Sequence, residues 1–211
     1  MNIAIIGTGE VGSVLGRRWG QKGHQIIFGS RSPESTRVQA LVEQIGVNAR
    51  ATLPDQAVLD AEIVVLATQH TVVKQVCKQL GDLGGKIIID PNNPLNEDGS
   101  GLTVGLTTSA GEEIASWFPN AFVVKAFNIT GATYNMADPI YSDQRLSMFI
   151  CGDDADAKAI VATLAEALNF VAVDCGPLTS ARYLEPMAML WITLARDMKL
   201  GGNIGFCLLT R

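Results

Sequence analysis

The chain has 211 residues, of which 47% are hydrophobic, and its formal net charge is -5. A chain of this length can bury one good core, with room for a small appended unit. The acidic balance provides no positive field of the kind that nucleic-acid binding needs, and no apolar stretch reaches the length of a membrane span.

The N-terminal stretch MNIAIIGTGE enters an apolar run directly, without a charged leader, which predicts a first strand rather than a signal peptide. The four cysteines form no CxxC pair and no cluster with histidine. We therefore predict neither a disulfide framework nor a metal site, and expect a reduced, cytoplasmic setting.

Short apolar runs alternate with longer segments of helical period, which is typical of parallel βαβ units. The expected strands are 3–6, 25–28, 62–67, 86–90, 122–127, 146–151 and 170–174, with a shorter strand near 48–53. The expected helices are 11–22, 33–45, 70–80, 110–118, 155–168 and roughly 179–200. This order predicts an α/β fold of the Rossmann type: a doubly wound, mostly parallel sheet with a small helical C-terminal lobe.

The residues that follow the predicted strands are nearly all small or polar. In an open parallel sheet, ligands bind beyond the carboxyl ends of the strands. Besides the glycine-rich loop after the first strand, the candidates in chain order are Ser30, Arg31, Ala67, Thr68, Gln69, His70, Asn92, Asn93, Ala126, Asn128, Ile129, Thr130 and Gly131. Such residues suit a cleft, lined by backbone, for a long polar ligand.

The sequence GTGEVG follows the first strand and opens the first helix, which is the context of a dinucleotide-binding loop. Gly7 permits the tight turn, Gly9 lets the backbone approach a pyrophosphate, and Gly12 lets the helix pack close to the strand. The N–H groups of this helix end then face the phosphates. The predicted contacts are Gly7, Thr8, Gly9, Glu10, Val11 and Gly12.

Ser30 and Arg31 stand at the end of the second strand, where an acidic residue usually binds the adenosine ribose of NAD. A 2′-phosphate would be repelled by an acid, whereas Arg31 can bind it bidentately and Ser30 can donate a hydrogen bond. Arg37, one helical turn further on, is a second candidate cation. The pattern predicts NADP rather than NAD as the cofactor.

Few side chains are candidates for acid-base chemistry. His24 lies in the turn before the second strand and is best explained as structural. His70 follows the fourth strand and could orient a ring or begin a helix. Lys125 interrupts an apolar strand, either for acid-base work or for pairing with a neighbour. Hydride transfer between two bound rings needs few catalytic side chains, because the cofactors carry the chemistry.

The chain resembles the NADPH-dependent deazaflavin reductases, which pass hydride between NADP and coenzyme F(420). The resemblance covers nearly the whole length and rests on IIGTGEVGSVLG, FGSRSPE, IIIDPNNPL and VVKAFNIT, and more specifically on CGDD, DCGPL and ARYLEP near the C-terminus. The cytosolic part of membrane ferric reductases is similar as well.

The resemblance implies an NADP-binding Rossmann domain at 1–150 and a C-terminal lobe at 151–211 that completes the acceptor pocket and a homodimer interface. It places the acceptor, a small molecule such as a deazaflavin or flavin, near His70, Ile129, Thr130 and Gly131. This chain departs from the family pattern after the fourth strand, where Thr68, Gln69 and His70 replace a proline and tryptophan, and near Ser35, where a basic residue is missing.

Three functions stay open at this point. The first is an NADPH-dependent oxidoreductase with a deazaflavin or flavin-like acceptor. The second is a reductase of a small imine or carbonyl, for which His70 is the obvious proton donor. The third is an NADPH-binding sensor without turnover.

Overall fold

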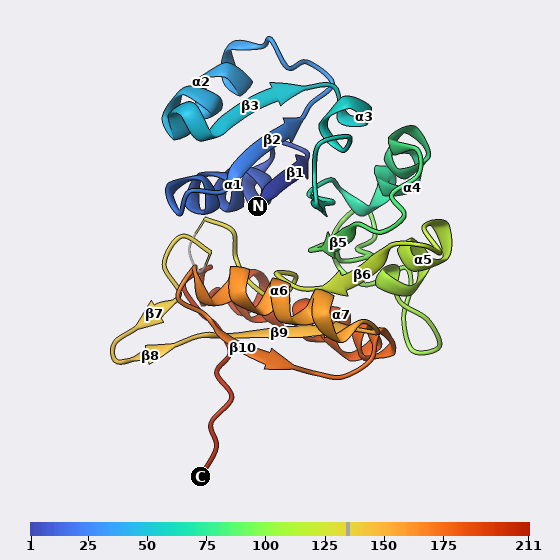
Figure 1. The fold of residues 1–211 in the computed structure, drawn as a ribbon. Coiled ribbons are helices and arrows are strands. Elements are labelled where there is room, and N and C mark those ends of the chain that lie inside the picture. Colours follow the sequence, from blue (N-terminus) through green and yellow to red (C-terminus); the bar gives the residue numbers. More distant parts are fainter. Residues whose placement is uncertain (134–135) are drawn as a thin grey trace.

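The computed structural model describes residues 1–133 and 136–211, and it has the predicted α/β architecture. One sheet of eight strands runs in the order β10-β9-β6-β5-β4-β1-β2-β3 (Figure 1). The chain starts at β1 in the middle, builds β2 and β3 on one side, and then returns to build β4, β5 and β6 on the other. This reversal next to β1 is where a doubly wound sheet forms its ligand crevice.

The sheet is parallel except at one pair of strands. Its members are β1 (Asn2–Ile6), β2 (Gln25–Gly29), β3 (Ala49–Thr52), β4 (Ile63–Val65), β5 (Ile87–Asp90), β6 (Phe122–Lys125), β9 (Ser147–Gly152) and β10 (Val171–Asp174). β9 runs antiparallel to β6, and β10 runs parallel to β9. A separate hairpin joins β7 (Ile140–Tyr141) to β8 (Gln144–Arg145).

Helices cover both faces of the sheet. They are α1 (Glu10–Gln21), α2 (Thr36–Ile45), α3 (Pro54–Ala57), α4 (His70–Leu80), α5 (Ala110–Trp117), α6 (Ala155–Glu166) and α7 (Ala181–Ile192). Residues of α1, α2 and α6 share one hydrophobic cluster, and residues of α3, α4, α5 and α7 share the other. Figure 1 shows α1 and α2 on one side of the strands and α3, α4 and α5 on the opposite side.

The alternation of side chains along β1 explains the two clusters. Ile3 and Ile5 belong to one, whereas Ala4 and Ile6 belong to the other, and all four are at most 1% exposed. A strand buried on both faces needs a continuous apolar run, which is what the sequence IAII supplies.

Two predicted helices differ from the observed ones at their ends. The helix expected at 33–45 begins at Thr36, because the preceding residues form a turn in which the Ser35 amide bonds to the Ser32 carbonyl. The helix expected at 179–200 is α7, which begins at Ala181 after a 3-10 turn and passes at Thr193 into a π-helical segment, Thr193–Asp197. The wider π turn carries Met198 into solvent, where it is 65% exposed.

The C-terminal part of the chain continues the sheet. The domain division predicted at residue 150 falls inside β9, and the C-terminal lobe contributes β10 as well as α6 and α7. Beyond the lobe, the last residues extend away from the body of the molecule (Figure 1). In the described part of the chain, no helix is both long and apolar enough to cross a membrane.

Candidate cofactor and acceptor site

The glycine-rich loop lies where β1, β2 and β4 meet. The Gly7 amide donates to the Gly29 carbonyl of β2 at 3.1 Å. Gly7 has a φ of +113°, and a Cβ there would collide with the carbonyl of Ala67, just beyond β4. A Cβ on Gly12 would meet the Gly7 carbonyl, so α1 lies against the loop. Gly7 and Gly12 are therefore required by packing, as the motif predicts.

Gly9 differs from its two neighbours, because a Cβ built on it would meet nothing within 4 Å. It is the N-cap of α1, and it offers no side chain to the free N–H groups of the first turn. The loop therefore presents an open helix end, with the partial positive charge of the helix dipole. Packing within the chain does not explain the glycine at this position, whereas the approach of a phosphate would.

The loop after β2 carries the residues predicted to read the ribose. Ser30 is half-buried, and its Oγ accepts from the Ser32 amide at 3.2 Å. Arg31 is exposed. Arg37, on the first turn of α2, donates from Nη2 to the Thr8 carbonyl at 3.1 Å, which joins α2 to the glycine loop. Arg31 therefore reaches solvent beyond the end of β2, and Arg37 is held against the glycine loop.

The described residues contain four buried side-chain polar atoms without a hydrogen-bond partner: Thr68 Oγ1, His70 Nδ1, Asn128 Oδ1 and Thr130 Oγ1. All four belong to the set predicted from the sequence. Thr68 follows β4 and His70 begins α4, whereas Asn128 and Thr130 follow β6; β4 and β6 are the two neighbours of β5. Buried polar groups in proteins are normally hydrogen-bonded, so these four atoms are available to a ligand or to water.

Two hydrogen bonds between Asn93 and Asn128 join the loops after β5 and β6. Asn93 donates from Nδ2 to the Asn128 carbonyl at 2.8 Å, and Asn128 returns a bond from Nδ2 to Asn93 Oδ1 at 3.0 Å. Asn128 also donates to the Leu184 carbonyl of α7 at 3.0 Å. These bonds leave Asn128 Oδ1 as the acceptor still available.

Two predicted cofactor residues are structural in their side chains. Asn92 is nearly buried, and its amide donates to the Leu66 carbonyl at 2.8 Å and to Asp90 Oδ1 at 3.0 Å. The side chain of Ala126 lies in the hydrophobic core with no exposed surface. Neither side chain therefore faces the cleft.

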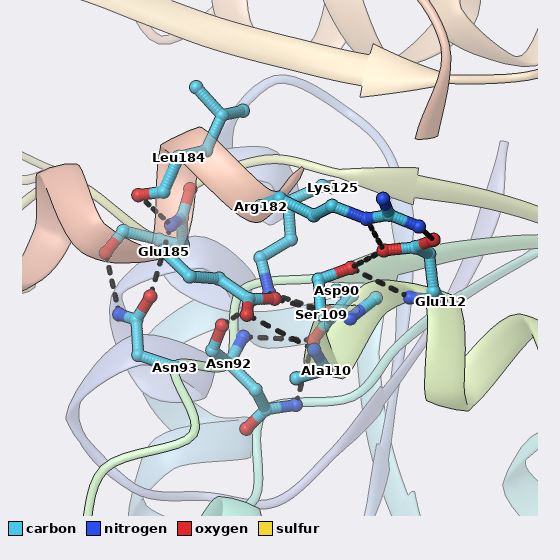
Figure 2. Close-up of polar contacts among 12 residues, drawn as sticks. Asp90, Asn92, Asn93, Ser109, Ala110, Glu112, Lys125, Arg182, Leu184 and Glu185 are labelled. Atoms are coloured by element: carbon cyan, nitrogen blue, oxygen red, sulfur yellow. Dashed lines mark hydrogen bonds and ion pairs between the residues drawn. The ribbon is translucent and has the colours of Figure 1, made fainter. Parts of the chain in front are cut away.

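Beneath these loops lies a buried ionic cluster that contains Lys125, Asp90 and Glu185 (Figure 2). Lys125 Nζ contacts Asp90 Oδ2 at 2.8 Å, Glu185 Oε1 at 2.7 Å and the Asn92 carbonyl at 2.6 Å. All three charged side chains are 0% exposed. The prediction that Lys125 could pair with a neighbour is confirmed.

Every hydrogen-bond partner of the two carboxylates is a donor. Asp90 accepts from the Asn92 amide and side chain, and Glu185 accepts from the Ala110 and Gly111 amides at the start of α5. Burial alone would lower the pKa of Lys125, but the two carboxylates outweigh it and raise that pKa.

A second ion pair fastens α7 to α5 at the edge of this cluster. Arg182 binds Glu112 through two bonds of 2.6 and 2.9 Å, and the Ser109 hydroxyl donates to Glu112 at 2.8 Å (Figure 2). The Arg182 hydrogen bond and charge lower the pKa of Glu112. The C-terminal lobe therefore contacts α5 through Arg182, and the carboxyl ends of β5 and β6 through Glu185 and Leu184.

The predicted acceptor loop contacts the C-terminal lobe directly. A Cβ on Gly131 would lie 2.9 Å from the ring of Trp191, so this close approach requires glycine. Trp191 donates from Nε1 to the Ile204 carbonyl at 2.8 Å. At the start of the loop, Phe127 has a φ of +64° and its ring packs edge-on against Trp19 and Phe170. Core packing thus fixes the direction in which the chain enters the loop.

The remaining reactive side chains lie elsewhere or are inert. Burial raises the pKa of the Cys77 and Cys151 thiols to about 12, so they are not nucleophiles at neutral pH. Burial lowers the pKa of His24, which lies before β2 and far from the cleft. Within the described ranges, no group of histidine, cysteine and carboxylate side chains could hold a metal ion.

The sequence predicts the loops that form the site, but it does not predict the ionic cluster beneath them. Asp90 and Glu185 were not candidates, although Asp90 ends an apolar strand in the same way that Lys125 does. A charge inside an apolar strand is the signal that could have found the pair. Glu185 has no such signal, because α7 brings it to the site from 60 residues away.

A doubly wound sheet with a glycine loop at its switch point is the architecture of a dinucleotide-binding protein. Residues 2–94 match the family model described as NADP oxidoreductase, coenzyme F(420)-dependent. The F(420)-dependent NADP reductase of Methanocaldococcus jannaschii is 30% identical over 96% of this chain and 96% of its own. A solved structure from Arthrobacter sp. FB24, described as a candidate F(420)-dependent NADP reductase, is 32% identical with a TM-score of 0.91 over the whole of both chains.

The chain belongs to the coenzyme F(420)-dependent NADP oxidoreductase family. The rat metalloreductase STEAP3 is 32% identical over 89% of this chain, which spans only 36% of that protein's length.

Proposed function

We propose that this protein transfers a hydride between NADP(H) and a deazaflavin or flavin-like acceptor. The observation that carries the proposal is the set of four unpaired buried polar atoms on Thr68, His70, Asn128 and Thr130. A nicotinamide carboxamide and a polar ring system both offer hydrogen bonds that these atoms lack. When bound, NADPH supplies the hydride, the acceptor takes it together with a proton, and NADP⁺ is left.

The proposed cofactor contacts follow the chain through the cleft. The phosphates are bound by the loop of Gly7, Thr8 and Gly9 and by the start of α1 at Glu10, Val11 and Gly12. Ser30 and Arg31 bind the 2′-phosphate. The nicotinamide end is bound by Ala67, Thr68, Gln69, Asn93 and Asn128, with Asn92 and Ala126 supporting from below. His70, Ile129, Thr130 and Gly131 line the acceptor side.

Arg31→Ala is expected to weaken NADPH binding about tenfold to a hundredfold, because a charged hydrogen bond contributes roughly 1.5–3 kcal/mol. NADH binding should hardly change, since NADH has no 2′-phosphate. Fluorescence titration with both cofactors measures the two dissociation constants. Arg17→Ala is the matched control, because Arg17 is half-buried on α1 and contacts Gln44. Equal losses for NADPH and NADH would remove Arg31 from the 2′-phosphate site.

The acceptor is tested by anaerobic oxidation of NADPH and NADH in parallel, each with coenzyme F(420), FMN or FAD. Fast loss of nicotinamide absorbance with NADPH and the deazaflavin alone is the expected result. Turnover with FMN and FAD but not with the deazaflavin would assign a flavin acceptor. NADPH binding without turnover on any of the three rings would contradict the proposal.

A second candidate is the reduction of a small imine or carbonyl, and one observation favours it. His70 begins α4 and has an unpaired Nδ1, so it could hold a proton for such a substrate. The same assay with cyclic imines and ketones tests this function. His70→Phe should abolish that turnover if His70 is the donor, but should leave transfer to a deazaflavin largely intact.

We also propose that the C-terminal lobe forms a homodimer interface. On α7, Tyr183 and Leu190 are 76% and 51% exposed, and their spacing of seven residues places them on one face of the helix with the exposed Pro186. Sedimentation equilibrium is expected to give the mass of two chains. A monomer at micromolar concentration would rule this interface out.

A further inference from the structure

The buried ionic cluster carries an unbalanced charge. Lys125 supplies one positive charge, whereas Asp90 and Glu185 supply one negative charge each, and none of the three side chains is exposed. Counted by formal charge, one ammonium and two carboxylates give the cluster one net negative charge, and the contacts of both carboxylates are with donors. The positive N-terminus of α5, which Glu185 contacts, offsets part of it.

The cluster lies directly beneath the proposed nicotinamide end of the cleft. Asp90 is the last residue of β5 and Lys125 the last of β6. The loops proposed to contact the nicotinamide, with Asn93 and Asn128, follow within three residues. The charge is buried, so solvent screens it weakly toward these loops. The nearby Arg182 and Glu112 pair is neutral and adds no net charge.

The two redox states of the cofactor differ in charge at this position. The nicotinamide ring is cationic in NADP⁺ and neutral in NADPH. A net negative charge beneath the ring attracts the cationic ring of NADP⁺ and has little effect on the neutral ring of NADPH. We infer that the Asp90–Lys125–Glu185 cluster stabilises bound NADP⁺ relative to bound NADPH, and so favours hydride flow from NADPH to the acceptor. This inference rests on the proposed cofactor site.

The expected size of the effect follows from Coulomb's law. A unit charge on the order of 10 Å from another changes a binding constant about fifteenfold at an effective dielectric constant of about 20. The N-terminus of α5 carries a partial positive charge of roughly half a unit, which opposes the cluster and reduces the expected change in the binding constant to about fourfold. Removing the net charge should therefore change the ratio of the NADPH and NADP⁺ dissociation constants by about fourfold to fifteenfold.

The test measures both dissociation constants by isothermal titration calorimetry in Glu185→Gln and Asp90→Asn. Each variant removes one negative charge, from α7 in one case and from β5 in the other. Circular dichroism first establishes that each variant is folded. Both are expected to weaken NADP⁺ relative to NADPH. Local disturbance at two different elements would not shift this ratio in the same direction by the same factor.

Glu112→Gln is the matched control. It removes a carboxylate from the same region and leaves Arg182 without its partner, but both side chains reach solvent, which screens the change, so the ratio should stay within twofold of the unsubstituted protein. An unchanged ratio in folded Glu185→Gln or Asp90→Asn overturns the inference. So does a shift in the opposite direction.

The unsubstituted protein provides a test that does not depend on the folding of a variant. It should bind NADP⁺ at least as tightly as NADPH. Tenfold tighter binding of NADPH would overturn the inference while leaving the proposed function standing. Failure to bind either form would instead contradict the proposed function.

Discussion

Lys125→Met is expected to lower the free energy of unfolding by roughly 3–5 kcal/mol, the usual cost of leaving buried charges without their partner. Methionine fills a similar volume, but it leaves Asp90 and Glu185 as two fully buried carboxylates without a cation between them. Urea unfolding followed by circular dichroism measures the loss.

The pH dependence of this variant distinguishes lost charge pairing from lost packing. Without Lys125, burial and mutual repulsion raise the folded-state pKa of the carboxylates above the unfolded value. Stability is then regained as the pH falls and the folded state takes up protons more readily than the unfolded state. The deficit at pH 5 should therefore be smaller than at pH 8. A deficit that is independent of pH would point to packing alone.

Lys158→Met is the comparison variant for the loss of stability expected in Lys125→Met. Lys158 binds Asp174 at 2.8 Å, but the Asp174 side chain is 61% exposed. Such a pair contributes less than about 1 kcal/mol, because solvent screens it. An equal loss in both variants would contradict the argument from burial.

Gly9→Val should leave the fold intact and abolish binding of NADPH and NADH alike. The backbone of Gly9 has a φ of -73° and a Cβ there meets nothing, so valine should cost only about 1 kcal/mol or less, mainly because it is a poorer N-cap residue than glycine. The added methyl groups would occupy the space through which a pyrophosphate approaches the helix end. Fluorescence titration and urea unfolding on the same sample separate the two effects.

Gly7→Val is the companion variant that should fail for a different reason. Its backbone φ of +113° is unsuited to a branched residue, and its Cβ would collide with Ala67. It should therefore lose stability as well as binding. Unchanged NADPH affinity in Gly9→Val would show that this loop is not the phosphate site.

The sequence predicts the fold well because the decisive signals are local. The apolar runs give the central strands, and the glycines at positions 7 and 12 mark the loop at the switch point. The short elements are missed: α3 has four residues and β7 and β8 have two each, too few for any period to show. The length of the last helix is overestimated because a π turn at Thr193 replaces the helix without a glycine or proline to announce it.

The site is predictable only where it follows the strands. The four residues with unpaired polar atoms are all among those predicted, because strand ends locate them. The ionic cluster is not predictable in the same way, since its members come from β5, β6 and α7 and meet only through the tertiary fold. Asn92 and Ala126 point their side chains into the protein interior. This orientation depends on packing, so the spacing of residues in the sequence does not predict it.

The distances along the chain within the buried cluster have a consequence for the order of folding. Lys125 lies 35 residues from Asp90 and 60 residues from Glu185 in the sequence. Elsewhere in the core, Trp19 donates to the Leu164 carbonyl, 145 residues away. Contacts this remote in sequence form late, because the entropy of closing the intervening loops must be overcome first. On the ribosome, the glycine loop emerges early, but the support beneath the nicotinamide end is complete only after α7 has been synthesised and docked.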